Sequence, residues 1–293
     1  MCIFLLGNGV IHYLQTGSAS HLHGYELNIF KSASPITIAL FCLFSAIFHL
    51  FLLTVQKYKI NKQSFLIHMV AIFFYAGFLF LFGNRMTILL LCISFPVFII
   101  KQLSAPKKKL SILLLFVMLV VAALVKNPSL KNQITEFAHL SSATLIQLDT
   151  DSSLGKSWGG IPLRIAIWNC SWGLIQKNWI AGTGTGDVQD ELQSVYEQRK
   201  FYFASRYNRY NAHNQYLQQF LANGIFGFVI FVLCIVVPLF FTFSHQTTRG
   251  LYLAFLIIFA FVCFSESFLE INKGIVWYSF FNSIFVFSEN KPN

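Results

Sequence analysis

Long apolar runs separated by short polar segments dominate the pattern of hydrophobic and polar positions along the chain. Seven such runs approach the length of about 20 residues that a helix needs to cross the hydrocarbon core of a bilayer. They cover residues 36–55, 65–82, 86–100, 110–125, 217–243, 251–265 and 271–287. Because a helix satisfies all of its backbone polar groups within lipid, these runs predict an all-α, polytopic transmembrane helix bundle of about seven spans.

Composition places the chain outside the class of soluble domains. Hydrophobic residues make up 56% of it and charged residues 11%, whereas soluble domains carry about 25% charged residues. The net charge of +10 would favour nucleic acid as the partner of a soluble protein. Here the basic residues lie mostly in short loops between apolar runs, which is typical of membrane topology. We therefore expect membrane lipids as partners and no nucleic acid.

The distribution of lysine and arginine predicts the orientation of the bundle. The short segments 56–64 and 101–109 carry Lys57, Lys59 and Lys62, and Lys101, Lys107, Lys108 and Lys109. With seven spans these segments lie on the same side as Arg249 and Lys291. By the positive-inside rule this side is cytoplasmic, so the long segment between the fourth and fifth runs is extracytoplasmic.

That segment, residues 127–216, is where we expect the chemistry of the single membrane domain 1–293. Structureless loops of this length are unusual, and long loops are more often functional than idle. Residues 131–148 and 161–176 are expected to be helices. The second has apolar residues at spacings of three and four and includes two tryptophans, which predicts an amphipathic helix in the membrane interface. The residues of this face are Ile161, Ile165, Trp168, Trp172 and Ile175.

Two arginines occur where they would meet a phosphate group near the membrane surface. Arg164 lies at the edge of the apolar face of helix 161–176, and Arg85 lies between two very apolar segments. A guanidinium clamps a phosphate through two parallel hydrogen bonds, and a charge at the end of a span favours a functional role. We expect Arg164 to meet lipid phosphates or a lipid-linked diphosphate, with a snorkelling arginine as the alternative. For Arg85 we expect a functional role, with simple interfacial anchoring as the alternative.

His213 directly precedes the fifth apolar run. If Asn211 is the N-cap of that helix, His213 falls in the first turn, where the helix dipole disfavours the imidazolium form. The neutral ring can then accept a proton. The alternative is a capping or structural histidine. Asn214, Arg206 and Arg209 are neighbouring candidates for substrate binding.

Neither a metal nor a cofactor is expected. The Gly-Thr-Gly-Thr-Gly run at 182–186 lacks the Lys-Ser/Thr ending of a P-loop, so it predicts a turn, in which the N–H of Gly184 could help to bind a phosphate. Asp149-Thr150-Asp151 is similar to a metal-binding DxD motif, but it lies outside the membrane, where nucleotide sugars are not supplied. The six cysteines form no CxxC pair, which argues against a zinc site or a disulfide framework.

The order of these motifs resembles that of bacterial O-antigen ligases and of the related O-antigen polymerases and protein O-oligosaccharyltransferases. His213-Asn214, followed after nine residues by Gly224-Ile225-Phe226-Gly227, is similar to a His-Asn-x9-Gly-x-x-Gly pattern of this family. Arg164 ahead of the Gly-rich run, and Arg85 at the start of a span, are similar to its arginine positions. The resemblance extends over residues 35–287. Members usually have ten or more spans, so we expect further helices upstream of this chain.

The resemblance implies transfer of a glycan from undecaprenyl diphosphate to lipid A-core, or to another acceptor, on the periplasmic face of the bacterial inner membrane. We expect an inverting, metal-independent glycosyltransferase. His213 would activate the acceptor hydroxyl, Arg85 and Arg164 would hold the departing diphosphate, and Asn214 would orient the site. The chemistry agrees, because histidine is a base near neutral pH and arginines stabilise a diphosphate leaving group.

Other functions stay open from the sequence. An O-antigen polymerase would add the same donor to another lipid-linked chain, and a protein O-oligosaccharyltransferase differs only in its acceptor. The sequence does not separate these acceptors. A transporter or flippase would place polar groups at the bilayer midplane, whereas the ionisable residues of this chain cluster in the long outer segment.

Overall fold

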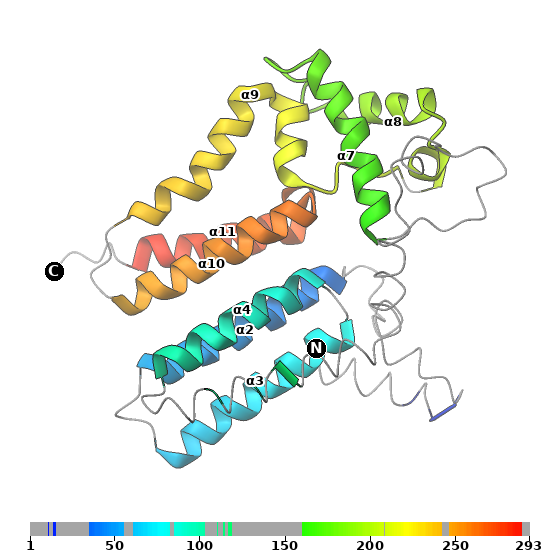
Figure 1. Cartoon of the computed structure of the whole chain (residues 1–293). Coiled ribbons are helices and arrows are strands. Elements are labelled where there is room, and N and C mark those ends of the chain that lie inside the picture. The colour runs from blue at the N-terminus through cyan, green and yellow to red at the C-terminus, as the bar shows by residue number, and fades with distance from the viewer. Residues whose placement is uncertain are drawn as a thin grey trace. The chain divides into compact units, whose positions relative to one another are not determined.

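The computed structural model describes residues 35–55, 61–82, 85–102, 160–207, 209–241 and 246–288, with a few isolated positions before residue 120. Every regular element in these ranges is a helix, and the chain divides into two compact units (Figure 1). The predicted all-α class is confirmed. The predicted helix 131–148 lies outside the described residues, as does nearly all of the predicted span 110–125.

The first unit contains the helices of the first three predicted spans. These are α2 (Pro35–Val55), α3 (Lys62–Phe82) and α4 (Arg85–Gln102), together with α10 (Gln246–Ser265) as far as Ile258. Leu50 and Leu53 of α2 are buried against Ile72 of α3. Phe44 of α2 packs edge-on against Phe255 of α10, with ring centroids 6.1 Å apart. Apolar side chains therefore hold this unit together.

The second unit combines a compact group of short helices with membrane-type helices. Its elements are α7 (Gly160–Lys177), α8 (Val188–Gln198), η3 (Phe203–Tyr207), α9 (Gln215–Val236), η4 (Val237–Phe240), the end of α10, η5 (Phe268–Glu270) and α11 (Asn272–Ser288). Ile167 of α7, Leu192 of α8 and Leu221 of α9 belong to one buried cluster. This shared core joins α7 and α8 to the first half of α9.

Four helices of the described part of the chain are long and apolar enough to cross a membrane. Their apolar windows are Ile36–Leu53, Lys62–Leu79, Gln215–Phe240 and Thr248–Ser265. Within α4 the apolar stretch Thr87–Pro96 is shorter, and α11 has 17 residues. The chain is thus a membrane protein with several spans, and the number seven stays a prediction.

Helix α7 occupies the position of the predicted amphipathic helix, but its packing involves a neighbouring face. Leu163, Cys170 and Leu174 are buried in the core of the second unit. Trp172, which belongs to the predicted face, is 52% exposed, whereas Ile175 of the same face is buried. Apolar residues occur on most sides of this helix, so spacing alone could not decide which of them would pack inside.

Helix α9 changes direction at Gly224, where φ is 61° and ψ is −159° (Figure 1). A side chain in this left-handed region is strained, and a Cβ at this position would also clash with the carbonyl oxygen of Ile180. The bend therefore requires glycine. It divides α9 into a first arm, residues 215–223, and a second arm from residue 225 onward.

At the bend, carbonyl groups of α9 lose their partners within the helix, and the Gly-rich turn provides hydrogen-bond donors for them. The backbone N–H groups of Thr183 and Gly184 donate to the carbonyl oxygens of Leu221 and Ala222 at 2.7 and 2.9 Å. In exchange, Ile225 donates to the carbonyl oxygen of Trp179 at 2.9 Å. Buried backbone groups need such partners, so the Gly-rich turn and the bend form one structural device.

We predict that Gly224→Ala lowers the temperature of half-unfolding of the detergent-solubilised chain, because it adds left-handed backbone strain of about 1–3 kcal/mol and a clash with Ile180. Gly186→Ala is the matched control, because a Cβ at Gly186 meets nothing within 4 Å. Thermal unfolding followed by circular dichroism compares the two variants. Equal stability of both would contradict the role given to Gly224.

Candidate functional site

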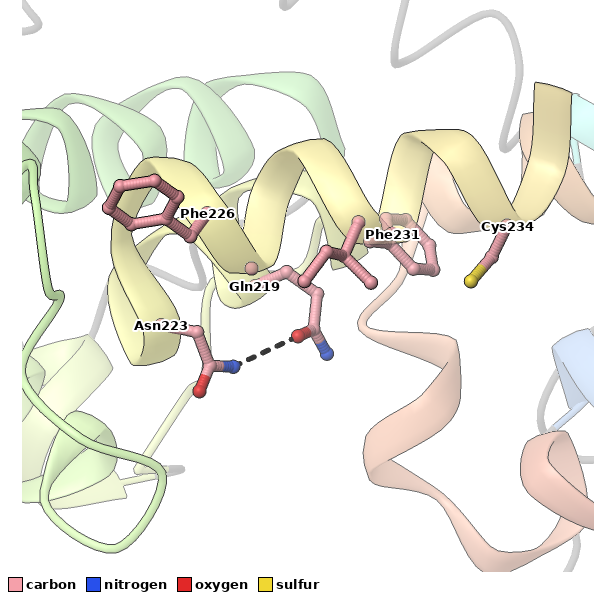
Figure 2. A pocket seen from close by; sticks show the side chains of 7 residues that line it. Gln219, Asn223, Phe226, Phe231 and Cys234 are labelled. Atoms are coloured by element: carbon pink, nitrogen blue, oxygen red, sulfur yellow. Dashed lines mark hydrogen bonds between the residues drawn. The ribbon is translucent and has the colours of Figure 1, made fainter. Parts of the chain in front are cut away.

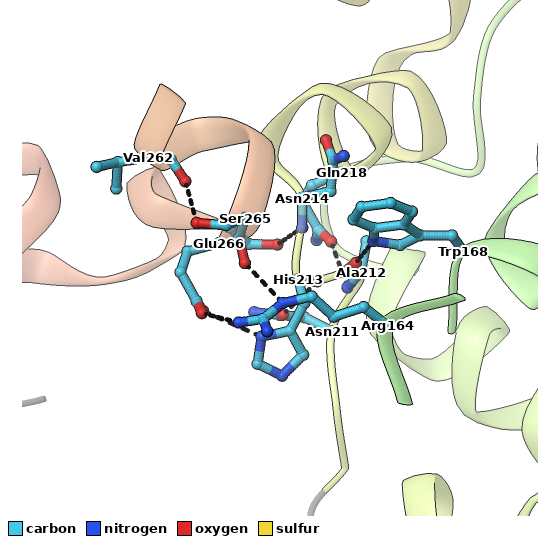
Figure 3. Close-up of polar contacts among 11 residues, drawn as sticks. Arg164, Trp168, Asn211, Ala212, His213, Asn214, Gln218, Val262, Ser265 and Glu266 are labelled. Carbon is cyan, nitrogen blue, oxygen red and sulfur yellow. Dashed lines mark hydrogen bonds and ion pairs between the residues drawn. The ribbon is translucent and has the colours of Figure 1, made fainter. Parts of the chain in front are cut away.

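Three ionisable side chains from three segments of the second unit meet at one point (Figure 3). The Nη2 atom of Arg164 lies 2.6 Å from Oε1 of Glu266, and Nδ1 of His213 lies 3.0 Å from Oε2 of the same carboxylate. The side chain of Glu266 is 10% exposed, against 30% for Arg164 and 24% for His213. Glu266 is therefore the buried centre of the cluster, and the other two side chains reach the surface.

Arg164 also closes the end of α10. Its Nε atom donates to the backbone carbonyl oxygen of Ser265 at 3.1 Å, which is the last residue of that helix. The last carbonyl groups of a helix have no partner within the helix and carry partial negative charge, so a guanidinium is favourable there. Within the described residues the hydrogen bonds of Arg164 involve Nε and Nη2, and Nη1 makes none.

His213 precedes α9 rather than lying in its first turn. The N-cap is Asn214, whose side-chain oxygen accepts from the backbone N–H groups of Tyr216 and Leu217 at 2.9 and 3.1 Å. The condition considered from the sequence, Asn211 as the N-cap with His213 in the first turn, is therefore not met. Asn211 and Asn214 are both favourable cap residues, and the sequence did not show which of them has the extended backbone of a cap.

The backbone of His213 is held in the left-handed region, with φ at 45°. Asn211 stabilises this turn, because its side-chain oxygen accepts from the backbone N–H of His213 at 3.1 Å. Such conformations are uncommon outside glycine and are concentrated at functional sites. The turn directs the imidazole ring of His213 toward Glu266.

The contact with Glu266 assigns the two ring nitrogens of His213 different roles. An ionised carboxylate only accepts hydrogen bonds, so Nδ1 donates in this pair, and in the neutral tautomer that does so the lone pair is on Nε2. Within the described residues Nε2 makes no hydrogen bond, and in Figure 3 it lies on the side of the ring away from Glu266. A histidine oriented in this way by a carboxylate is suited to accept a proton through Nε2.

The segment that contains Glu266 is fastened directly to the start of α9. The backbone N–H of Asn214 donates to Oγ of Ser267 at 3.3 Å. The backbone N–H of Leu269 donates to the side-chain oxygen of Gln215 at 2.7 Å, and Gln215 is fully buried. The N-cap and the first residue of α9 thereby fix the turn that follows α10, and this determines where the carboxylate of Glu266 lies.

Two aromatic side chains contact the turn that contains His213. The indole N–H of Trp168 donates to the carbonyl oxygen of Ala212 at 3.1 Å. The ring of Tyr210 lies edge-on to the imidazole, with centroids 5.0 Å apart. Trp168 thus connects α7, which contains Arg164, to the residue before His213.

The arginines predicted to bind substrate have acidic partners on α8. Arg209 lies 3.0 Å from a carboxylate oxygen of Asp190. Arg206 lies 3.4 Å from one of Glu197 and stacks over the ring of Tyr202 at 4.0 Å. All four charged side chains are largely exposed. Their role in substrate binding stays a prediction.

The other predicted site residues lie in different settings. The side chain of Asn214 is used as the helix cap, and the N–H of Gly184 is used in the bond to Ala222. Arg85 begins α4 in the first unit, and its membership of this site stays a prediction. The Asp149–Asp151 segment lies outside the described residues.

Sequence reasoning missed Glu266 as a member of the site. The signal that could have revealed it is its position directly after an apolar run, because a carboxylate at the end of a span is costly unless it has a partner. It also missed Arg199, whose Nη1 donates to the side-chain oxygen of Asn169 at 2.5 Å and ties the end of α8 to α7.

Two further titratable groups of the unit are unsuited to proton transfer. Burial raises the pKa of the Cys170 thiol and of the Tyr196 phenol. Both side chains are fully buried in the core. They therefore stay protonated near neutral pH and belong to the packing of the unit.

A groove of about 500 Å³ runs along the second arm of α9 from the bend (Figure 2). Its polar end is formed by Gln219 and Asn223, whose side chains share a hydrogen bond of 3.1 Å. The rest of its lining includes Phe226, Ile230 and Phe231. One end of the groove is therefore polar and the rest is apolar, a distribution that matches an amphiphilic ligand.

The fold and the site define a polytopic membrane protein in which histidine, glutamate and arginine meet at the ends of two spanning helices. A family model described as O-antigen ligase matches residues 68–232, which is more than half of the chain. The chain belongs to this family of glycosyltransferase-like enzymes, whose substrates are lipid-linked glycans. The predicted family is confirmed. No curated protein and no solved structure matches the chain significantly.

We predict a pH-dependent role for Ser205, which donates a 2.5 Å hydrogen bond to Glu197. This bond lowers the pKa of Glu197, with a smaller contribution from Arg206. A lowered pKa stabilises the fold above the usual carboxyl pKa, and this contribution is lost as the pH falls through the lowered value. Ser205→Ala should therefore reduce thermal stability at neutral pH, and the difference from wild type should shrink in acid. A difference that is constant with pH would contradict this.

Proposed function

We propose that this protein is an O-antigen ligase-type glycosyltransferase that moves a glycan from undecaprenyl diphosphate to lipid A-core. The reaction takes place on the outer face of the bacterial inner membrane. In this proposal residues 127–216 face the periplasm, as the distribution of lysine and arginine favours. Belonging to the O-antigen ligase family supports the substrate class.

One observation supports the proposal more than any other, namely that Glu266 contacts both His213 and Arg164. A base and a phosphate-binding cation are the two groups that this transfer needs. Here a single buried carboxylate orients both of them. In this proposal Glu266 accepts the Nδ1 hydrogen of His213, which leaves Nε2 as the base. The Nη1 group of Arg164 would bind the phosphate.

In the proposed reaction the acceptor hydroxyl oxygen attacks the anomeric carbon of the first sugar from the face opposite the diphosphate. The new C–O bond forms as the bond between that carbon and the diphosphate oxygen breaks, so the configuration inverts. The hydroxyl proton passes to Nε2 of His213. Undecaprenyl diphosphate leaves with the bonding electron pair, and Arg164 stabilises its charge. The same role for Arg85 stays a prediction.

We propose that the transfer needs no metal ion. A divalent cation would neutralise the leaving diphosphate, and in this scheme the arginines supply that positive charge. The carboxylate of the site is also already engaged, because Glu266 pairs with Arg164 at 2.6 Å. The polarity of the groove along α9 is compatible with a lipid-linked substrate.

We predict that His213→Asn reduces ligation by about 10²–10⁴-fold, the usual contribution of a general base, and leaves membrane insertion unchanged. Asparagine is a better replacement than alanine at this position, because asparagine tolerates the left-handed backbone of His213. Ligation is measured with membranes, lipid-linked donor and lipid A-core. Full activity of this variant would exclude the proposed base.

We predict that Glu266→Gln also lowers the turnover number and that Glu266→Asp retains more of it. Glutamine removes the negative charge that holds Arg164 and the Nδ1 proton of His213, so both groups lose their orientation. The KM for the acceptor should change less than kcat, because the carboxylate contacts the catalytic groups. A change in KM alone would show that Glu266 serves acceptor binding.

We predict that deletion of the gene leaves unmodified lipid A-core while full-length lipid-linked polymer accumulates. That pattern follows because a ligase acts after polymerisation. An O-antigen polymerase deletion would instead leave single repeat units on the core, and a protein O-oligosaccharyltransferase deletion would leave the lipopolysaccharide unchanged. Gel profiles of lipopolysaccharide and of extracted lipid-linked glycan distinguish the three.

A further inference from the structure

In the region of α7 and α8, the large apolar side chains that are exposed all lie between residues 172 and 180. Trp172 is 52%, Trp179 54% and Ile180 52% exposed. Between residues 160 and 223 no other described large apolar side chain is exposed. These three residues, the α7-end patch, lie on the last turns of α7 and in the segment directly after it.

Helix α8, in the same region, exposes polar and charged side chains, as helices of soluble proteins do. Helix α8 buries Val188, Leu192, Val195 and Tyr196, and its exposed residues are all polar or charged: Asp190, Glu191, Ser194, Glu197 and Gln198. Since α8 keeps the usual alternation of apolar inside and polar outside, the exposed apolar residues at the end of α7 are a local exception.

The segment that carries Trp179 and Ile180 meets α9 at the point where the exposed side chains of α9 become apolar. None of the residues 215–223 of the first arm is exposed. Beyond Gly224 the exposed side chains are apolar, with Phe226 at 67% and Ile230 at 61%, as expected of a spanning helix in contact with lipid. The patch joins α9 at this change, because the carbonyl oxygen of Trp179 accepts from Ile225 at 2.9 Å.

We propose that the α7-end patch is a membrane anchor, in which Trp172, Trp179 and Ile180 insert at the boundary between lipid headgroups and acyl chains. Tryptophan is enriched at this depth because its ring is apolar and its N–H is polar. Lys177, which is exposed between the two tryptophans, can reach the headgroup phosphates. The bilayer surface is the partner, and this inference does not depend on glycan transfer.

The anchor determines the depth of the functional site. Arg164 and Trp172 are on the same helix, and eight residues of helix span about 12 Å. Arg164 also binds the carbonyl group at the end of α10, a spanning helix. Insertion of Trp172 therefore keeps the backbone of Arg164 within about 12 Å of the depth of that tryptophan.

The experiment measures the depth of the two tryptophans in the full chain, reconstituted in nanodiscs of phosphatidylcholine. The chain has five tryptophans, so the emission of Trp172 and Trp179 is obtained as the difference between wild type and the double variant W172F/W179F. One set of nanodiscs contains lipid brominated near the carbonyl end of the acyl chains, and a second contains lipid brominated near the methyl end. Iodide serves as the quencher in water.

We expect the shallow bromines to remove most of the difference emission, the deep bromines to remove less, and iodide to have little effect. Ser194→Trp in the W172F/W179F background is the matched control on α8, and it should be quenched by iodide and not by brominated lipid.

Three results would overturn the anchor. Quenching of the difference emission by iodide alone would place the patch in water. Resistance to all quenchers would mean that protein covers it. Stronger quenching by the deep bromines, or lipid quenching of the Ser194→Trp control, would show that the region lies at a different depth.

Discussion

The buried carboxylate of Glu266 is the constraint on which the second unit depends. A charged group with 10% exposure is costly unless it is paired and hydrogen-bonded. Its two oxygens find their partners on two different elements, Arg164 of α7 and His213 ahead of α9. The end of α10, the start of α9 and the second turn of α7 must therefore meet at this point. The interaction that satisfies the charge also brings a base and a cation together.

The bend of α9 is a second constraint of the same kind. A continuous helix from Gln215 to Phe240 would have 26 residues, about 39 Å, which exceeds the hydrocarbon thickness of about 30 Å. At Gly224 the helix gives up internal hydrogen bonds and receives those of the Gly-rich turn instead. This exchange separates an arm that packs in the core with α7 from an arm with lipid-facing residues, and it fixes the turn after α7 against α9.

The residues predicted from the sequence to bind substrate make different contacts in the structure. Arg164 and His213 were predicted to act together, and the structure brings them to one carboxylate. Gly184 was expected to offer its N–H to a phosphate, yet that group donates to Ala222. Arg206 and Arg209 face the acidic residues of α8. Short polar motifs resemble ligand sites in sequence, and only the surrounding chain shows whether their donors are already used.

The sequence by itself determined the membrane character, the helical class and the approximate position of the described apolar helices, because the length of an apolar run is dictated by the thickness of lipid and needs no knowledge of contacts. It also predicted the family, through His213, Arg164 and the glycines between them and beyond. Only the tertiary structure revealed that Glu266 pairs with His213 and Arg164. Glu266 lies 53 residues beyond His213 and outside the 68–232 match. The tertiary structure alone decided that Asn214 is the cap and which face of α7 is buried. The physical reason is that pairing of a buried charge, choice of a cap and burial of one side of an apolar helix depend on neighbours that are distant in the chain.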